Sequence, residues 1–326
     1  MLNPSVSVII CTLDRGVFLR RVLNAIAGWR SSFQELIVVV GPTQDDTEFI
    51  LLENKHFINK TIFTEFKNVS VARNLGLKAA SQDIILYLDD DVIPSAEWVE
   101  FHVRAHQERG SQCGCIAGAV ADKTRPDAPL QFSHGVHDRL SVSHPVLSIA
   151  SEQRYLSSPR WFSGVMGANA SYKREALLKI DCFDEFFEYF LEETDVCLRL
   201  SNAGYTIHHI DVTVNHYVQP SHNRRDRRHL TCWYSLAKNT TYFALKHGCQ
   251  WVYSPVFLIR LAGLLTYRCL LRILRLKLTH HLPNALLLQY IQEAIAGVAE
   301  GWRAGLQFHN QSSHRLAEPK KQPGWE

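Results

Sequence analysis

The chain has 326 residues, of which 46% are hydrophobic and 21% charged, the composition of a globular protein with a substantial core. This composition excludes extended disorder and fibrous repeats, and the net charge of +3 is too small to predict a nucleic-acid partner. The length predicts one large domain with an appendage, or two domains.

The first 90 residues alternate between short apolar runs and amphipathic segments. Buried strands are predicted at 5–11, 36–40, about 62–66 and 84–88, where the chain is rich in β-branched and other apolar residues. Helices are predicted between them, at 14–29, from 47 and at 69–80. This alternation is typical of a parallel, doubly wound α/β sheet with its sites at the carboxyl ends of the strands.

The next 130 residues are less regular. Helices are predicted at 96–108, from 173 and at 192–202, and strands at 115–120, 161–172 and 206–214. The stretch from 121 to 160 is polar, contains four prolines and shows no periodicity. We therefore expect it to be an irregular segment that is functional or mobile.

The composition changes near residue 219, which predicts two domains, 1–220 and 221–326. The second begins with a basic cluster: Arg224, Arg225, Arg227 and Arg228. Residues 255–277 are rich in leucine, but four arginines interrupt every run long enough to span a membrane: Arg260, Arg268, Arg272 and Arg275. At 100° per residue these arginines fall within an arc of roughly 120°. The pattern favours a helix lying in a membrane interface, over a helix packed on the domain with a solvated basic face.

Eight cysteines show no even spacing, and Met1–Pro4 lack the basic and apolar parts of a signal peptide, so a cytoplasmic protein is expected. Cys113 and Cys115, with His134 and His137 downstream, offer four zinc ligands. Their C-x-C spacing differs from the usual C-x₂-C pattern, which favours two small residues in a packed strand.

Asp89, Asp90 and Asp91 directly follow a predicted buried strand. Adjacent carboxylates repel one another, and a bound cation relieves that repulsion. Oxygen ligands suit Mg²⁺ or Mn²⁺, which commonly bridge carboxylates to substrate phosphates. The alternative is an acidic loop that caps the next helix.

A second acidic cluster, Glu192, Glu193 and Asp195, opens a predicted helix. The helix dipole favours carboxylates there, but one of them can also take a proton from an attacking hydroxyl. His216 closes the last predicted strand. It is either a hydrogen-bonded surface residue or a metal ligand in the same crevice.

Five segments occur in an order that resembles family 2 glycosyltransferases, the inverting nucleotide-sugar enzymes of GT-A fold. They are SVSVIICTLDR, NVSVARNLGLKAASQDIILYLDDDVIP, GANASYKREAL, FDEFFEYFLEETDVCLRLSNAGY and VNHY, within residues 5 to 217. The resemblance implies a GT-A type, Rossmann-like, mostly parallel sheet flanked by helices, to which the tail adds a C-terminal helical extension.

The resemblance also implies a role for each matching residue. Thr12 and Asp14 would line the nucleotide pocket, and Arg73 and Asn74 match the family's ARN segment near the nucleotide. Asp89, Asp90 and Asp91 match the DxD motif: Asp89 and Asp90 would lie on the nucleotide side and Asp91 would bind the metal. Glu192 and Glu193 match the paired acidic motif, with Glu193 as the base, and His216 would complete the metal site. The donor-sugar and acceptor pocket would include Gly167, Ala168 and Asn169.

One departure concerns the nucleotide base. Val40 and Gly41 stand where the family often has an acidic pair that contacts the base, and Asp45 and Asp46 follow as possible replacements. The nucleotide therefore stays open among UDP, GDP and dTDP.

The leading hypothesis is an inverting transferase that uses Mn²⁺ or Mg²⁺ and moves a sugar from a nucleotide-sugar donor to an acceptor hydroxyl. The basic tail suggests a saccharide or lipid-linked acceptor at the inner face of the cell membrane, as in bacterial surface-polysaccharide or glycolipid assembly. One alternative is a metal-dependent nucleotidyltransferase, but CTLDRG lacks the expected glycine- and lysine-rich phosphate loop. The other is a non-catalytic sugar- or partner-binding module, suggested by Val40 and Gly41.

Overall fold

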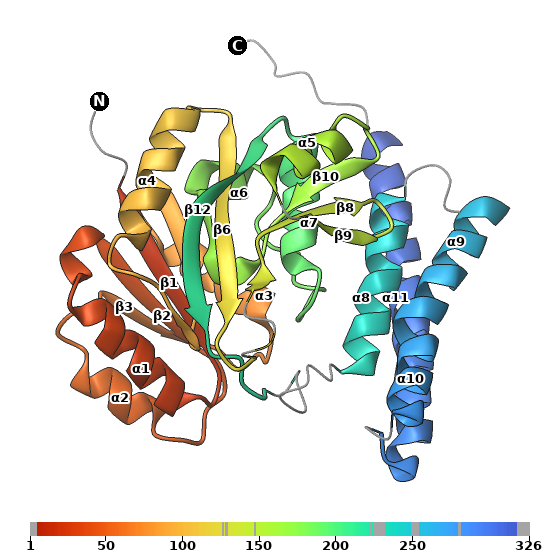
Figure 1. Cartoon of the computed structure of the whole chain (residues 1–326), viewed down its shortest axis with the longest axis horizontal. Helices are drawn as coiled ribbons and strands as arrows, with labels where there is room; N and C mark the ends of the chain where they lie inside the picture. The colour runs from red at the N-terminus through yellow and green to blue at the C-terminus, as the bar shows by residue number, and fades with distance from the viewer. Residues whose placement is uncertain are drawn as a thin grey trace. The chain divides into compact units, whose positions relative to one another are not determined.

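The computed structural model describes residues 5–125, 127, 130–146, 148–221, 223, 232–248, 254–279 and 282–317, with side chains as far as His309. The chain divides into two compact units (Figure 1). Unit 1 comprises Met1–Asp138 and Ser143–Leu230, and unit 2 comprises Arg139–Val142 and Thr231–Glu326. The domain boundary predicted at 220/221 remains a prediction.

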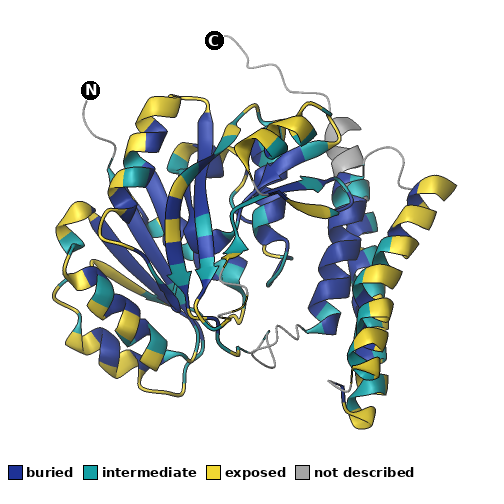
Figure 2. Ribbon diagram, viewed as in Figure 1, coloured by how far each residue is buried: buried dark blue, intermediate teal, exposed yellow. Residues whose placement is uncertain are grey.

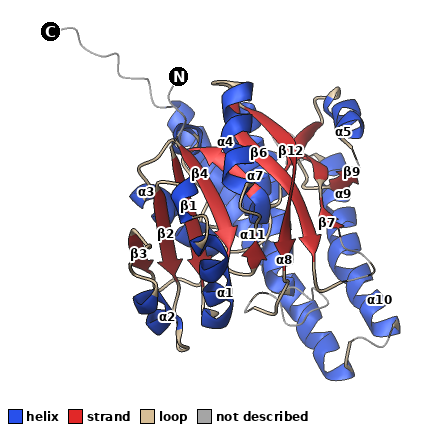
Figure 3. Ribbon diagram, turned by 60° about the vertical axis from the view of Figure 1, so that its left-hand side comes forward, coloured by secondary structure: helices blue, strands red, loops and turns tan. Residues whose placement is uncertain are grey.

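The described part of unit 1 is built on a nine-stranded sheet (Figure 3). Its order is β3 (Lys60–Phe63), β2 (Glu35–Val40), β1 (Val6–Thr12), β4 (Ile84–Asp89), β11 (Ala170–Lys173), β6 (Cys113–Asp122), β12 (Thr206–His216) and β5 (Val92–Ile93), with β7 (Leu130–Phe132) paired to β6. The first four strands are parallel, β6 and β12 are parallel, and β11 runs antiparallel to both its neighbours. The predicted α/β class with a mostly parallel sheet is confirmed.

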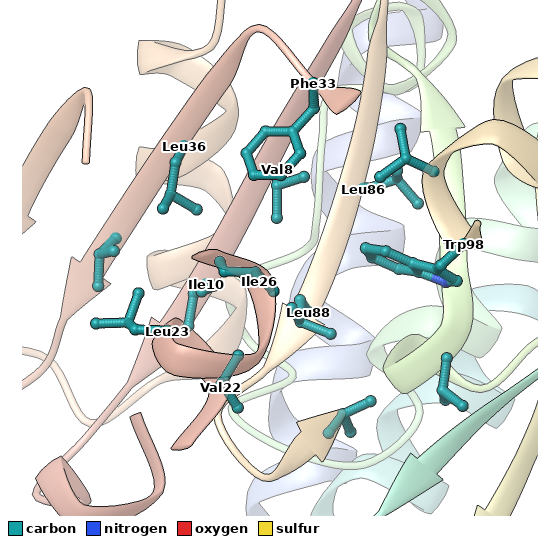
Figure 4. Packing of buried hydrophobic residues seen from close by; sticks show 14 of the residues in the cluster. Val8, Ile10, Val22, Leu23, Ile26, Phe33, Leu36, Leu86, Leu88 and Trp98 are labelled. Carbon is teal, nitrogen blue, oxygen red and sulfur yellow. The ribbon is translucent and has the colours of Figure 1, made fainter. Parts of the chain in front are cut away.

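Helices cover both faces of this sheet, which explains why its strands read as continuous apolar runs. They are α1 (Gly16–Ala27), the short η1 (Arg30–Ser32), α2 (Thr47–Glu53), α3 (Val69–Ala79), α4 (Trp98–Arg109), α6 (Arg174–Lys179) and α7 (Glu192–Asn202). Val8 and Ile10 of β1 pack with Leu23 and Ile26 of α1 in one core cluster (Figure 4). Ile9 points to the opposite face, where a Cβ on Gly76 of α3 would lie 2.5 Å from its side chain. Glycine at 76 therefore lets α3 approach the sheet closely.

The described part of segment 121–160 contains strands and a helix, so the prediction that it is irregular is wrong. Besides β7 it contains β8 (His134–Asp138), β9 (Ser143–Val146) and α5 (Ile149–Leu156), and β8 pairs with β9 and with β10 (Trp161–Gly164). Strands of three to five residues are too short to show a clear alternation. Pro145 lies in β9, an edge strand of this second sheet, where its missing N–H is tolerated.

The predicted single strand at 161–172 is instead divided between the two sheets. β10 belongs to the second sheet, the 3₁₀ turn η2 (Gly167–Asn169) follows, and β11 enters the main sheet between β4 and β6. The glycines at 164 and 167 interrupt the run where the chain leaves one sheet for the other.

Unit 2 is built mainly of helices in its described residues. It contains α8 (Trp233–His247), α9 (Pro255–Leu265), the π-helical turn η4 (Thr266–Leu271), α10 (Arg272–Leu278) and α11 (Asn284–Ala317). The long helix α11 packs on α8 through Gly297, Gly301 and Gly305, where any Cβ would lie within 2.6 Å of an α8 atom. The predicted C-terminal helical extension is confirmed.

The four arginines of α9, η4 and α10 do not form one basic face. Arg268 donates to Ser141 and Thr240, and Arg272 lies 5.4 Å from the centroid of the Trp233 ring, all within unit 2. Arg260 and Arg275 are exposed. The π-helical turn changes the number of residues per turn, so the 100° count used for the prediction fails across it.

Many residues of the same helices are exposed (Figure 2), and several of these are apolar. The most exposed are Val256, Ile259, Tyr267, Leu271 and Leu278. Among the described residues, no helix has the length and apolarity needed to cross a membrane. The predicted basic cluster at 224–228 lies outside the described residues.

Candidate active site

A cavity of about 480 Å³ opens in unit 1 at the carboxyl ends of β1 and β4. Its volume is within the range of small-molecule sites, and strand ends of this kind are where such sites occur. Most of the predicted site residues line it: Thr12, Arg73, Asp89, Asp90, Asp91, Gly167, Ala168, Glu192, Glu193 and His216.

Arg15 joins two of the aspartates, although no role was predicted for it. Its Nη2 lies 2.6 Å from Asp91 Oδ2, and its Nε lies 3.3 Å from Asp90 Oδ1. Thr12 Oγ1 donates to Asp90 Oδ2 at 2.7 Å. The only sequence signal for Arg15 was its position just after β1, at the edge of the sheet where the aspartates after β4 were also expected.

The adjacent Asp90 and Asp91 have opposite pKa shifts. Burial raises the pKa of Asp90 to about 7, because the Arg15 charge offsets burial and the neighbouring Asp91 charge only in part. Burial also opposes ionisation of Asp91, but the hydrogen bond and charge of His216, together with Arg15, hold its pKa well below the usual range. Asp91 is therefore the permanently charged member of the pair.

His216 faces Asp91 from the end of β12. Its Nε2 lies 3.1 Å from Asp91 Oδ1, and both side chains are almost fully buried. Its Nδ1 lies 2.8 Å from Gln131 Oε1, a carbonyl oxygen that accepts, so Nδ1 carries the hydrogen. A divalent metal would take the place of the proton between Nε2 and the carboxylate, and these N and O donors suit Mn²⁺. The residues present therefore fit the divalent metal that the sequence predicts.

Arg73 occupies the other side of the cavity. Its Nη1 lies 3.0 Å from Glu193 Oε1 and 3.3 Å from Glu192 Oε1. Burial disfavours the guanidinium charge, but Glu193, Glu192 and Asp89 hold the pKa of Arg73 far above its usual value. A Cβ on Gly167 would lie 2.1 Å from Glu193 Oε1, so only glycine leaves room for this ion pair.

The two glutamates differ in exposure. Glu192 is buried, and burial together with the Glu193 charge raises its pKa well above the ordinary value despite Arg73. The Glu193 side chain is 18% exposed. Both follow Phe190 and Leu191, which line the cavity with φ of 79° and 73°. Such left-handed backbone is strained for these residues and concentrates at functional sites.

Comparison with known proteins gives the family. Residues 7–181, more than half of the chain, match the sequence profile described as "Glycosyl transferase family 2". The chain belongs to glycosyl transferase family 2.

Curated relatives and solved structures agree with this family. The "Pre-mycofactocin glycosyltransferase" of Mycobacterium tuberculosis is 25% identical over 208 residues, 62% of this chain and 40% of the relative. The chain thus spans about two fifths of the length of that relative. S. aureus TarS 1-349, crystallised with UDP-GlcNAc, matches with TM-score 0.56 and 15% identity over 94% of this chain and 92% of that one. The mannosyltransferase PcManGT of Pyrobaculum calidifontis, crystallised with GDP-Man and Mn²⁺, matches with TM-score 0.51 and 14% identity over 95% and 88%. The last two likenesses show the GT-A fold.

Three residues predicted for this family 2 site do not line the cavity. Asp14 accepts a hydrogen bond from the backbone N–H of Gln44. Asn74 joins α3 to the chain before α7, donating to Phe183 O and accepting from Phe183 N. Asn169 is fully buried and bonds Trp98, His102 and two backbone carbonyls. These contacts are structural, and the predicted ligand contacts of the three residues stay predictions.

The acids expected to replace the family's base-contacting pair also lie outside the residues that line the cavity. Asp45 Oδ2 accepts from the N–H of Gly16, and Oδ1 accepts from Thr43 and Thr47. These hydrogen bonds overcome burial and lower the pKa of Asp45 to about 2. Asp45 therefore joins the starts of α1 and α2.

The alternative zinc quartet does not assemble. Cys113 and Cys115 are buried in β6, where Cys113 Sγ lies 3.7 Å from His106 Nδ1. His137 bonds Ser143 on the second sheet, whereas His134 lies beside His209. The two cysteines are small residues in a packed strand, as the favoured interpretation held.

Proposed function

We propose that this family 2 member is a metal-dependent, inverting glycosyltransferase that transfers a sugar from a nucleotide-sugar donor to an acceptor hydroxyl. The observation that carries the proposal is one cavity holding Asp91 with His216, the candidate metal ligands, and Glu193, the candidate base. These side chains come from different parts of unit 1 and line the same cavity, so a single bound donor can lie beside all of them.

Asp91 and His216 would hold the divalent metal, with Asp90 beside them. The metal, when bound, would offset the negative charge that develops on the leaving nucleoside diphosphate. Arg15 keeps the Asp91 carboxylate oriented, and the Gln131 contact fixes the His216 ring. Thr12 holds Asp90 Oδ2 through its hydroxyl. The side chains are thus oriented before ligand binds, which lowers the cost of assembling the site.

Glu193 would act as the general base. It would accept the proton of the acceptor hydroxyl while that oxygen attacks the anomeric carbon and the bond to the diphosphate oxygen breaks. Burial raises the pKa of Glu192 and favours its neutral carboxyl, whereas Glu193 is the more exposed of the two and lies 3.0 Å from Arg73 Nη1. Arg73 would position Glu193, and a single displacement of this kind inverts the anomeric centre.

The donor panel should include several nucleotides. The fold neighbours were crystallised with UDP-GlcNAc and with GDP-Man and Mn²⁺, so the fold accepts more than one base. Each candidate donor is incubated with the full chain and Mn²⁺, and nucleoside diphosphate release is measured. We expect slow, metal-dependent release from one donor. A binding module would release no nucleoside diphosphate, and a nucleotidyltransferase would release pyrophosphate only when given a nucleoside triphosphate and a sugar phosphate in a parallel reaction; either result would refute the proposal.

The acceptor is proposed to be a saccharide or lipid-linked hydroxyl at a membrane surface. The support comes from unit 2, where the apolar residues of α9, η4 and α10 are exposed and Arg275 adds positive charge beside them. Apolar side chains flanked by basic ones bind the interface of anionic bilayers. Peripheral attachment at the inner face of the cell membrane, and a place in surface-polysaccharide or glycolipid assembly, follow from this hypothesis.

A further inference from the structure

Three side chains of unit 1 converge away from the catalytic cavity. They are His134 of β8, Glu152 of α5 and His209 of β12, and one potential ligand atom from each lies within 4.8 Å of the others. None of the three lines the cavity. In the part of the chain that the structure describes, this is the only group of three or more His, Cys, Asp or Glu residues that meets this spacing.

The contacts around His209 and Glu152 orient them toward each other. His209 Nε2 lies 3.1 Å from the carbonyl oxygen of Gly164, which accepts, so Nε2 carries the hydrogen and the Nδ1 lone pair is free. Nδ1 lies 3.1 Å from Glu152 Oε2. Ser163 Oγ donates to the other carboxylate oxygen, Oε1, at 2.6 Å. Two acceptor atoms facing each other require a cation between them.

A proton is a poor candidate for that cation. Although the two atoms are close, the contact from His209 Nδ1 does not have hydrogen-bond geometry. The His134 ring centroid lies 4.7 Å from that of His209, so a charge on one imidazole opposes a charge on the other. The buried Nδ1 of His134 has no hydrogen-bond partner in the described structure.

We propose that His134, Glu152 and His209 bind a Zn²⁺ ion. Two imidazole nitrogens and one carboxylate are a known zinc donor set, with a fourth position left for water. The contacts of Gly164 with His209 and of Ser163 with Glu152 are the outer hydrogen bonds that orient ligands around a metal. The ion ties the second sheet and α5 to β12 of the main sheet. Gly135 and His137, which follow His134 on β8, line the catalytic cavity, so the ion stabilises one wall of it.

The test is zinc titration of the full-length protein after dialysis against a chelator, in competition with a chromophoric zinc indicator. We expect one tight equivalent in the wild type and a rise in Tm with Zn²⁺ but not with Mg²⁺. Glu152→Gln and His134→Asn should weaken binding more than ~10²-fold, and Ser163→Ala about 10-fold. The matched control is His208→Gln, which removes the neighbouring imidazole of β12, bonded to Thr206. It should keep the zinc.

Asp91→Asn separates this site from the catalytic metal, because it should keep the tight zinc equivalent. A wild-type protein that takes up no zinc in the competition overturns the proposal without reference to any variant. So does a zinc equivalent that survives in both ligand variants, or one that Asp91→Asn removes.

Discussion

Unit 1 buries charge, whereas helices α9 and α10 of unit 2 expose apolar side chains. In unit 1, Asp90, Asp91 and Arg73 are each at most 5% exposed around a cavity. In unit 2, Ile259 and Leu278 are 71% and 79% exposed while Arg268 turns inward to Ser141. Each arrangement costs free energy in an isolated molecule, since buried charges lose hydration and exposed leucines order water. Under the proposed function, a metal and a nucleoside diphosphate would compensate the first cost, and a bilayer surface would compensate the second.

The largest expected effect comes from removing a buried charge. Asp91→Asn replaces the carboxylate between Arg15 and His216 with a neutral amide, a weaker ligand for a hard cation. Transfer should fall by roughly 10³-fold, in line with the loss of a principal electrostatic contact in a reaction site. Calorimetric titration of the donor with and without Mn²⁺ should show the metal-dependent part of the affinity disappearing. Donor binding that is independent of metal in both proteins would mean that Asp91 has another task.

Glu193→Gln tests which of the two glutamates is the general base. Turnover should fall by ~10²-fold or more with little change in donor affinity, the loss expected for a general base. Glu192→Gln is the matched control and should cost far less, because the raised pKa already favours a neutral Glu192. If the two variants exchange these results, Glu192 is the base.

The buried charge was the part of the site that the sequence predicted best. Asp89 to Asp91 follow a long apolar strand, and the strand–helix alternation before them fixes the end of the sheet where they lie. Arg15 was missed because its role depends on the chain after β1 bringing it to the end of β4, 76 residues later in the sequence. His134, Glu152 and His209 were missed as a group because three separate elements bring them together.

The errors have local physical causes as well. The strands of 121–160 are too short for an alternation to stand out, and Pro145 reads as a breaker unless the strand is known to be an edge. On η4 and α10, Arg268 and Arg272 make contacts within unit 2, which an angular count of the arginines alone does not anticipate. Asn169 was predicted in the pocket with Gly167 and Ala168. The 3₁₀ turn η2 instead directs its side chain into the core, where it accepts a hydrogen bond from Trp98.

A third prediction concerns His102 and His106, two buried histidines of α4. Burial lowers the pKa of His102 from 6.5 to about 4 and that of His106 to about 3. Between pH 6.5 and 4 the unfolded chain binds protons that folded His102 does not, so stability falls as pH falls. From pH 7 to pH 5, His102 alone should cost about 2 kcal/mol. Urea unfolding at both values should show a smaller loss in His102→Gln, whereas His56→Gln, which removes an exposed imidazole, should keep the wild-type difference.

The smallest expected effect tests the apolar surface of unit 2. Ile259→Asn removes roughly 1 kcal/mol of apolar transfer, so liposome binding should fall about 5-fold on neutral and anionic lipid alike. Arg275→Gln should weaken binding by a similar factor only on anionic lipid, and less at high salt, because a basic residue contributes about 1 kcal/mol near such a surface. The matched control is Phe49→Asn on α2 of unit 1, which removes a side chain that is 61% exposed. Co-sedimentation at two salt concentrations separates these contributions. If Ile259→Asn and Phe49→Asn lose equal amounts of liposome binding, the exposed apolar residues of unit 2 have no special role. If the wild-type protein stays in the supernatant with anionic liposomes at low salt, membrane association is excluded.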